Sequence, residues 1–304
     1  MAISRTQLVK ELEPGLNALF GLEYKRYENQ HAEIYVTESS DRAFEEEVML
    51  SGFANAQTKA EGSGVAFDSA QETYTARYTH DTIALAFAIT EEAIEDNLYD
   101  RISSRYTKAL ARSMSNAKQV KAVTPLIDGL PSTDGFDSGD GVSLFNTAHT
   151  TVSGTNVKNT LTTQADLNET SLEQSLIDIA AMTDERGLRI AARGVKMIIP
   201  SELQFTAERL MKSQGRTGTA DNDINAIGSM GMIPQGYRVN NYLTDSDAFY
   251  IITDVPNGMK MFQRAPLKTA MEGDFDTGNV RYKARERYSF GVSDYRGIFG
   301  VEGA

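Results

Sequence analysis

The chain has 304 residues, of which 40% are apolar and 24% charged, so a packed core is expected and global disorder is excluded. Acidic residues outnumber basic ones by 42 to 30, and the net charge of -12 argues against tight, non-specific binding of nucleic acid over the whole surface. There is no cysteine, which excludes disulfides, thiolate metal sites and cysteine nucleophiles.

The N-terminal segment predicts a helical arm, in which the Pro14-Gly15 pair is a place for a bend or break. Its apolar residues recur at helical spacing: Leu8, Leu12, Leu16, Leu19 and Phe20. The charged residues of this segment interrupt any apolar stretch of the length that a secretory signal needs. Residues 34–72 are rich in Ser, Glu, Gly and Ala with little period, which indicates an extended excursion from the body of the protein.

Two alternating stretches follow, at 74–79 and 82–89, and a period of two predicts β-strands. We read the pair His80-Asp81 between them as a polar turn. Thr90 is expected to cap a helix that continues until near Pro125, about 35 residues and about 50 Å long. The mean helix has about 11 to 12 residues, so this one would act as a beam. No segment reaches the roughly 18 consecutive apolar residues of a membrane span.

A loop dense in Asp, Gly and Ser, at 128–142, places a domain border near residue 130. The region behind it predicts a mixed α/β module with these elements: an amphipathic helix at 169–186 ended by Gly187, a buried strand at 195–199 stopped by Pro200, a helix from Ser201 to Met211, and a central strand at 249–252. At the end of the chain, residues 280–292 alternate between an apolar and a basic face. This pattern predicts a strand of about 13 residues, long enough to run under the long helix. Its basic row consists of Arg281, Lys283, Arg285 and Arg287.

No motif supports catalysis or cofactor binding. The histidines His31, His80 and His149 lack metal-ligand spacing, and neither the glycine-rich phosphate loops nor the Gly-x-Ser-x-Gly elbow is present. The loop at 134–141 lacks the ligand order of a calcium loop, and we read it as a solvated turn. We therefore expect no enzyme activity, no cofactor and no metal.

Three stretches are similar to those of a known family: LFNTAH at 144–149, YLTDSDAFYI at 242–251 and RERYSFGVSDYRGIFG at 285–300. With the order of arm, excursion, strands, long helix, mixed module and final strand, they resemble the major capsid proteins of tailed bacteriophages with the Hong Kong 97 fold, in particular the Mu-like major head subunits. The third stretch is the most telling. The resemblance spans most of the chain beyond about residue 70, and the preceding residues match in shape only.

The resemblance implies an α+β capsid fold with a spine helix and a long β-sheet. Its parts would be an N-terminal arm at 1–33, an extended loop at 34–72, a peripheral domain at 73–130 and 263–304, and an axial domain at 131–262. It also implies a structural subunit that self-assembles into hexamers and pentamers of an icosahedral head around double-stranded DNA. Such a protein is assembled in the host cytoplasm and resides in the virion.

The partners implied are further copies of the chain, with room for separate scaffold, portal and decoration proteins. Packaged DNA would be contacted weakly at most, and no membrane is involved. Two alternatives stay open: an encapsulin-like compartment that holds protein cargo, and a soluble hydrolase or binding protein with a site near His149.

One hypothesis goes beyond the resemblance. We expect Glu45, Glu46 and Glu47 of the extended loop to lie over the basic row of an adjacent subunit and to set its register. The alternatives are that both are solvated faces, because exposed pairs contribute only about 0 to 1 kcal/mol each, or that the basic row faces packaged DNA. Some relatives link a loop lysine covalently to an asparagine, but no such bond is expected for Lys59, the only lysine of the loop.

Overall fold

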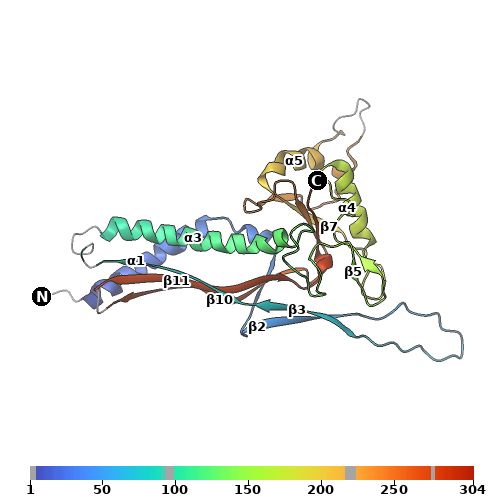
Figure 1. Cartoon of the computed structure of the whole chain (residues 1–304), viewed down its shortest axis with the longest axis horizontal. Helices are drawn as coiled ribbons and strands as arrows, with labels where there is room; N and C mark the ends of the chain where they lie inside the picture. Colours follow the sequence, from blue (N-terminus) through green and yellow to red (C-terminus); the bar gives the residue numbers. More distant parts are fainter. Residues whose placement is uncertain (1–4, 91, 93–98, 216–223, 275–277) are drawn as a thin grey trace.

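The structure is a computed structural model that describes residues 5–90, 92, 99–215, 224–274 and 278–304. It has an elongated body in which a long helix lies along a long sheet, a second module at one end, and a projecting ribbon (Figure 1). The body sheet has the order β1-β10-β11-β4 and the second sheet the order β12-β9-β7-β8. This arrangement is the expected α+β class.

The body contains β1 (Val36–Ser39), β4 (Asp81–Ile89), β10 (Met259–Gly273), β11 (Val280–Val292), α1 (Arg5–Arg26), α3 (Tyr99–Asp128) and the short helix η1 (Gln30–Glu33). The ribbon contains β2 (Phe44–Leu50) and β3 (Glu72–Thr79). The second module contains β5 (His149–Thr150), β6 (Asn156–Val157), α4 (Glu169–Ala181), β7 (Gly194–Ile199), η2 (Ser201–Leu203), α5 (Gln204–Lys212), α6 (Ala226–Met230), β8 (Tyr237–Val239), β9 (Phe249–Thr253), η3 (Tyr295–Gly297) and β12 (Ile298–Val301). In the described part of the chain, no helix combines the length and apolarity needed to cross a membrane.

The final long strand confirms its prediction, because β11 spans 13 residues and its burial alternates along its first half. It pairs antiparallel with β10 on one side and with β4 on the other. Its inward side chains, among them Tyr282 and Ala284, pack against Leu110 and Met114 of α3. The period of two therefore places one face of the strand under the long helix, as expected.

The arm packs on the body of its own chain. Leu16 and Phe20 of α1 are buried in the same cluster as the inward residues of β11, whereas Leu22 is 73% exposed. The helix continues through Pro14, where we expected a bend or break. We attribute this to packing, because Leu16 and Phe20 of the following turns are held against α3 and offset the missing hydrogen bond.

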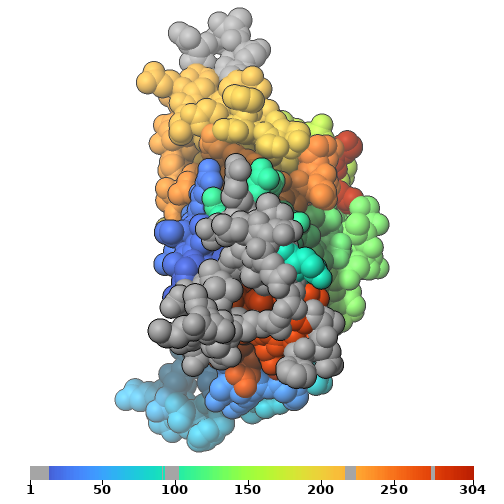
Figure 2. All heavy atoms as spheres, turned by 90° about the vertical axis from the view of Figure 1, so that its left-hand side faces the viewer, coloured from blue at the N-terminus to red at the C-terminus, as the bar shows by residue number. Residues whose placement is uncertain are grey.

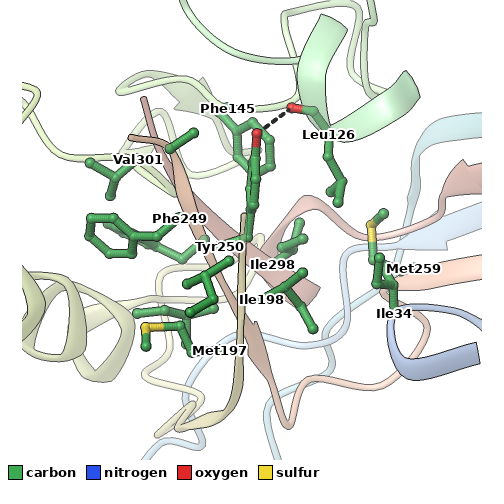
Figure 3. Close-up of a cluster of buried hydrophobic side chains, with 14 of the residues drawn as sticks. Ile34, Leu126, Phe145, Met197, Ile198, Phe249, Tyr250, Met259, Ile298 and Val301 are labelled. Atoms are coloured by element: carbon green, nitrogen blue, oxygen red, sulfur yellow. Dashed lines mark hydrogen bonds between the residues drawn. The ribbon is translucent and has the colours of Figure 1, made fainter. Parts of the chain in front are cut away.

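The end of the long helix is embedded in the second module. In Figure 3, Tyr250 of β9 stands among Phe145, Ile198 and Ile298, and its hydroxyl donates a hydrogen bond of 3.3 Å to the carbonyl oxygen of Leu126. The helix α3 passes through Pro125 and ends at Asp128. Its predicted beginning, after Thr90, falls largely outside the described residues. The body and the module thus share one continuous core.

Two local predictions are wrong. The helix α4 ends at Ala181 and not at Arg186, because residues 183–189 form a tight turn whose backbone amides donate to the Asp184 carboxylate. Local hydrogen bonds of this kind compete with the helix. Gly187 has a φ of 82° inside that turn.

The pair His80-Asp81 is not a turn between two paired strands. The strand β3 pairs with β2 in the ribbon, and β4 pairs with β11 in the body. His80 is buried where the two sheets meet, and its ring nitrogens lie 3.0 Å from Ser40 Oγ and 2.9 Å from Ser289 Oγ. A local reading of the sequence could not show this, because all three residues come together only in the folded chain.

A buried ion pair joins the long helix to the sheet. Lys118 Nζ of α3 lies 2.5 Å from Glu286 Oε1 of β11, and the hydroxyl of Tyr24 in the arm donates to Glu286 Oε2 at 3.3 Å. Both charged side chains are at most 10% exposed. Lys121, one turn further along the same helix, makes an exposed pair with Asp81, also at 2.5 Å.

We predict that Lys118→Met lowers the free energy of unfolding by about 3 kcal/mol, because it leaves the buried Glu286 carboxylate unpaired. The matched control, Lys121→Met, should cost less than about 1 kcal/mol, because its pair is exposed. Denaturant unfolding of the unassembled chain measures both values. Equal losses for the two variants would contradict the assignment of Lys118–Glu286 as the pair that holds the body.

The end of the arm is held by His31. Its backbone N–H donates to Gln119 Oε1 of α3 at 2.9 Å, and its Nδ1 lies 3.0 Å from Gln119 Nε2. Burial, together with the nearby Lys118, lowers the pKa of His31 to about 4. The folded chain therefore keeps this imidazole neutral.

We predict that His31 lowers the free energy of unfolding as the pH falls from about 6.5 to about 4. In this range the unfolded chain binds a proton at His31 and the folded chain does not. The variant His31→Asn should lack this contribution. The measurement is the free energy of unfolding against pH for both chains. Curves that stay parallel across this range would show that His31 does not titrate with folding.

Candidate intersubunit surfaces

The ribbon of β2 and β3 has two faces of different character. Along β2 the burial alternates, so that Glu45 and Glu47 point toward the body of the chain while Phe44, Glu46 and Val48 are exposed on the other face. A period of two in side-chain direction is inherent to a strand. The three glutamates of the sequence hypothesis are therefore divided between the two faces.

The inward glutamates have partners in their own chain. Lys260 Nζ lies 2.5 Å from Glu47 Oε1 and 3.2 Å from Glu38 Oε1. Burial lowers the pKa of Lys260, but the two carboxylates outweigh this effect, so that the pKa is raised overall. Glu45 Oε1 accepts a hydrogen bond of 2.7 Å from Ser40 Oγ. These contacts fix the base of the ribbon to the body.

Beyond the paired strands, residues 51–71 form an irregular loop that is exposed almost throughout. The Asp68 carboxylate ties its two arms together by accepting from the backbone N–H of Ala54 at 2.7 Å. Phe53, Val65 and Phe67 are 61%, 68% and 96% exposed. In the view along the long axis, the ribbon (light blue) lies at the opposite end of the molecule from α5 (gold) (Figure 2). The sequence predicted an extended excursion over 34–72, but its first part, β1, belongs to the body sheet. Sequence reasoning also missed the apolar side chains of the loop, which stand out in a segment of Gly, Ser and Ala.

The outer face of the body sheet carries the basic row. Arg281, Lys283 and Arg285 are exposed and stand in register with Ala88, Ala86 and Ala84 of β4, so a floor of alanines lies beside the cations. On the other side, Lys268 of β10 is paired with Arg285. The sequence hypothesis did not include Lys268, because its place on this face follows from the pairing of two distant strands.

The members of the row differ in their partners. Arg281 is bound to Asp274 at 2.5 Å, whereas Lys283 and Arg285 have no ion-pair partner among the described residues. Arg287 is half-buried near His80, and its charge adds to the effect of burial in lowering the pKa of that imidazole. The cations of the row that are exposed and lack an ion-pair partner among the described residues are therefore Lys283 and Arg285.

The stretch at 285–300 makes the junction between the two sheets. After β11 the chain turns through η3, and Arg296 is buried there with its guanidinium 2.6 Å from Glu185 Oε1 and 3.2 Å from Asp294 Oδ1. Its Nε donates to the Thr183 carbonyl oxygen at 2.8 Å. Burial raises the pKa of Asp294, although Arg296 opposes this effect. Arg296 and Asp294 of this stretch thus hold the junction together through buried ion pairs and hydrogen bonds.

Two glycines of the same junction allow backbones to touch. A Cβ built on Gly297 would lie 2.3 Å from the Cα of Gly258, and one built on Gly300 would lie 2.6 Å from the ring of Phe145. A side chain at Gly297 would push the two backbone segments apart, and one at Gly300 would displace the ring of Phe145. Phe145 belongs to the stretch at 144–149, so two of the three family-like stretches pack on each other.

The stretch at 242–251 contains two neighbouring carboxylates. Burial and a hydrogen bond with Asp247 raise the pKa of Asp245 to about 6. The Asp247 backbone N–H donates to Asp245 Oδ1 at 3.3 Å. This pair ends the turn that leads into β9.

His149, the centre of the alternative hydrolase hypothesis, is completely buried. Its Nδ1 lies 2.6 Å from Asp140 Oδ2, its Nε2 lies 3.2 Å from Asn159 Oδ1, and its ring stacks on Tyr295 at 3.9 Å. Both nitrogens are engaged in structural hydrogen bonds. Within the described ranges, no group of three or more His, Asp or Glu side chains could hold a metal ion.

Comparison with known proteins agrees with this picture. A family model described as phage capsid protein matches residues 72–301. Among solved structures, that of Mycobacterium phage Patience is 12% identical with a TM-score of 0.59, covering 99% of this chain and 89% of its own. The capsid of an empty GTA particle is 14% identical with a TM-score of 0.53, covering 90% and 89%. A virus-like particle from Pyrococcus furiosus is 8% identical with a TM-score of 0.51, covering 94% and 98%.

At these identities the solved structures show the fold alone, and no curated protein matches the sequence. The family model, however, covers most of the chain. The chain belongs to the phage capsid protein family: it has the Hong Kong 97-type capsid fold and is a structural protein of the virion shell, not an enzyme.

Proposed function

We propose that this chain is the major subunit of an icosahedral phage head, in which hexamers and pentamers enclose double-stranded DNA. The observation that carries this proposal is the projecting ribbon with its exposed apolar side chains, above all Phe67 at 96% exposure. Apolar groups on a segment without a core of its own are unfavourable in water and become favourable when another copy covers them. Repeated contacts of moderate size then add up over a closed lattice.

The division of labour within the subunit is part of the proposal. Residues 1–33 would be the N-terminal arm, 34–72 the extended loop, 73–130 and 263–304 the peripheral domain, and 131–262 the axial domain. The two sheets support this division in outline, with three exceptions. The strand β1 pairs with β10 in the body sheet, β3 pairs with β2 in the ribbon, and β12 pairs with β9 in the second sheet. Membership of the Mu-like subfamily is proposed from the three stretches at 144–149, 242–251 and 285–300.

An encapsulin-like shell is the alternative, and the shared fold does not separate it from a phage head. Electron micrographs of the purified protein test for closed shells, and analysis of their contents separates the two functions. Enclosed DNA supports the phage head, and co-purifying protein cargo supports the compartment. A chain that stays monomeric at high concentration would refute both.

The ribbon of one subunit would lie on the basic face of the next, as the sequence hypothesis for Glu45, Glu46 and Glu47 suggests. Glu46 supports this contact because it is exposed and, among the described residues, forms an ion pair only with Arg77, at 3.8 Å. Its neighbours on the same face, Phe44 and Val48, would pack on the alanine floor of β4. Glu45 and Glu47 already have partners in their own chain, so we propose that Glu46 carries the charge of this contact.

We predict that Phe67→Ser reduces the yield of assembled particles by about tenfold or more, because a buried aromatic anchor is worth about 2 kcal/mol at an interface. The melting temperature of the unassembled chain should not change, since the ring has almost no contacts within it. Particle yield is measured by sedimentation. The matched control is Ala70→Ser, an exposed residue of the same loop. Equal yields for both variants would sink this role of Phe67.

We predict that Glu46→Lys weakens assembly at low salt, because it places a cation against Lys283 and Arg285, and that Arg285→Glu in the same chain restores it. The loss should shrink as salt screens the charges. The readout is the critical concentration for assembly at two salt concentrations. If Glu46→Lys assembles like the parent chain at low salt, the ribbon does not lie on the basic row.

A further inference from the structure

A hollow of about 690 Å³ opens on the second module. Its walls are mostly apolar and include Leu176, Ala180, Met230 and Met232. Ala191, also in the wall, has a φ of 52°, a left-handed conformation that is unfavourable for a residue with a Cβ. Flexible methionines at a rim adapt to an incoming side chain, so the hollow has the character of a socket for an apolar group.

The socket lies at one end of β7, one of the two inner strands of the second sheet. Its wall includes Gly194, the first residue of β7, and Asp254, which follows Thr253, the register partner of Gly194. The loop that carries Met232 is fastened to the same end, since the Gln235 N–H donates to the Val195 carbonyl oxygen at 3.0 Å. The socket therefore sits at the N-terminal end of β7.

A matching projection lies at the other end of the same strand. After β7 ends at Ile199, the chain passes through η2, and Phe205 near the start of α5 is 73% exposed. It is the sole aromatic among the large apolar side chains that the described part of the axial module exposes. Six residues of strand separate the two features by about 17 Å. Socket and projection therefore lie at opposite ends of β7 in one copy.

The charges around the two features are complementary. The socket carries one cation and one anion, Arg193 and Asp254. Phe205 is flanked by an exposed anion and an exposed cation, Glu202 and Arg209. Among the described residues, none of these four side chains forms an ion pair. Phe205 between Glu202 and Arg209 thus has a matching surface on the same chain, namely the apolar socket between Arg193 and Asp254.

We propose that Phe205 of one copy occupies the socket of the next copy, with Glu202 opposite Arg193 and Arg209 opposite Asp254. Because the two surfaces lie at opposite ends of β7, the contact is head to tail, and its repetition closes a ring of axial modules. This inference rests on the proposed shell function and deepens it by naming the residues that join neighbours within one capsomer.

A pair of new cysteines tests the contact directly, because the chain has none of its own. In the double variant Phe205→Cys with Met232→Cys, mild oxidation of assembled particles should give a ladder of covalent multimers on a non-reducing gel. The two positions belong to features separated by the length of β7, about 17 Å, whereas the Cα atoms of a disulfide lie about 4.4 to 6.8 Å apart, so no link within one copy is expected. Each single variant is the control and should give no ladder. Particles that form but remain monomeric on the gel overturn the proposal.

A charge exchange provides an independent test. Arg193→Glu and Glu202→Arg should each lower particle yield about tenfold through like-charge contacts, and the double variant should restore it to within about twofold. Melting of the unassembled chains checks that all variants fold. A double variant no better than the singles counts against the contact while leaving the shell function intact. If the parent chain forms no particles, the shell function fails, and absence of the cysteine ladder in concentrated solution then refutes the contact as well.

Discussion

The body of this protein depends on one carboxylate buried on an otherwise apolar strand face. Glu286 projects from β11 toward α3, where Lys118 neutralises it at 2.5 Å and Tyr24 of the arm adds a hydrogen bond. An unpaired charge in this position would cost several kcal/mol, so sheet, helix and arm must come together for the site to be satisfied. The pair therefore specifies how three segments that are distant in sequence are placed. The remaining surfaces of the subunit are free to serve its neighbours.

The elements that could be predicted from sequence are those whose signal is local and periodic. The strand at 280–292 was predicted over its full length, because its side chains keep a period of two, with Glu286 as the one charged residue on the apolar face. The long helix and the buried strand before Pro200 follow from the same kind of evidence. Pairing between strands could not be predicted, since β3 and β4 are separated by His80 alone and yet join different sheets. The end of α4 was missed because hydrogen bonds to Asp184 displaced a helical pattern that the sequence continues.

The candidate surfaces were predicted in part. The sequence located the glutamates of the ribbon and the basic row, but treated three consecutive glutamates as one charge cluster. A strand sends Glu46 to one face and its neighbours to the other, and this division could have been inferred from the period alone. The socket and Phe205 carry no sequence signal, because an apolar residue on an amphipathic helix is ordinarily part of a core. The buried Arg296 with Glu185 and Asp294 was equally invisible, since its partners lie in separate segments.

The close approach of Gly258 and Gly297 has a mechanical consequence. These backbones touch where the chain passes between the two sheets, since Gly258 connects β9 to β10 and Gly297 precedes β12, next to the buried guanidinium of Arg296. No flexible side chain lies between the two backbones to yield under load. A push on the axial module, such as outward pressure on a filled shell, is thus transmitted to the long strands through a rigid fulcrum. The subunit would tilt as one piece, and strain would collect at its contacts with neighbours.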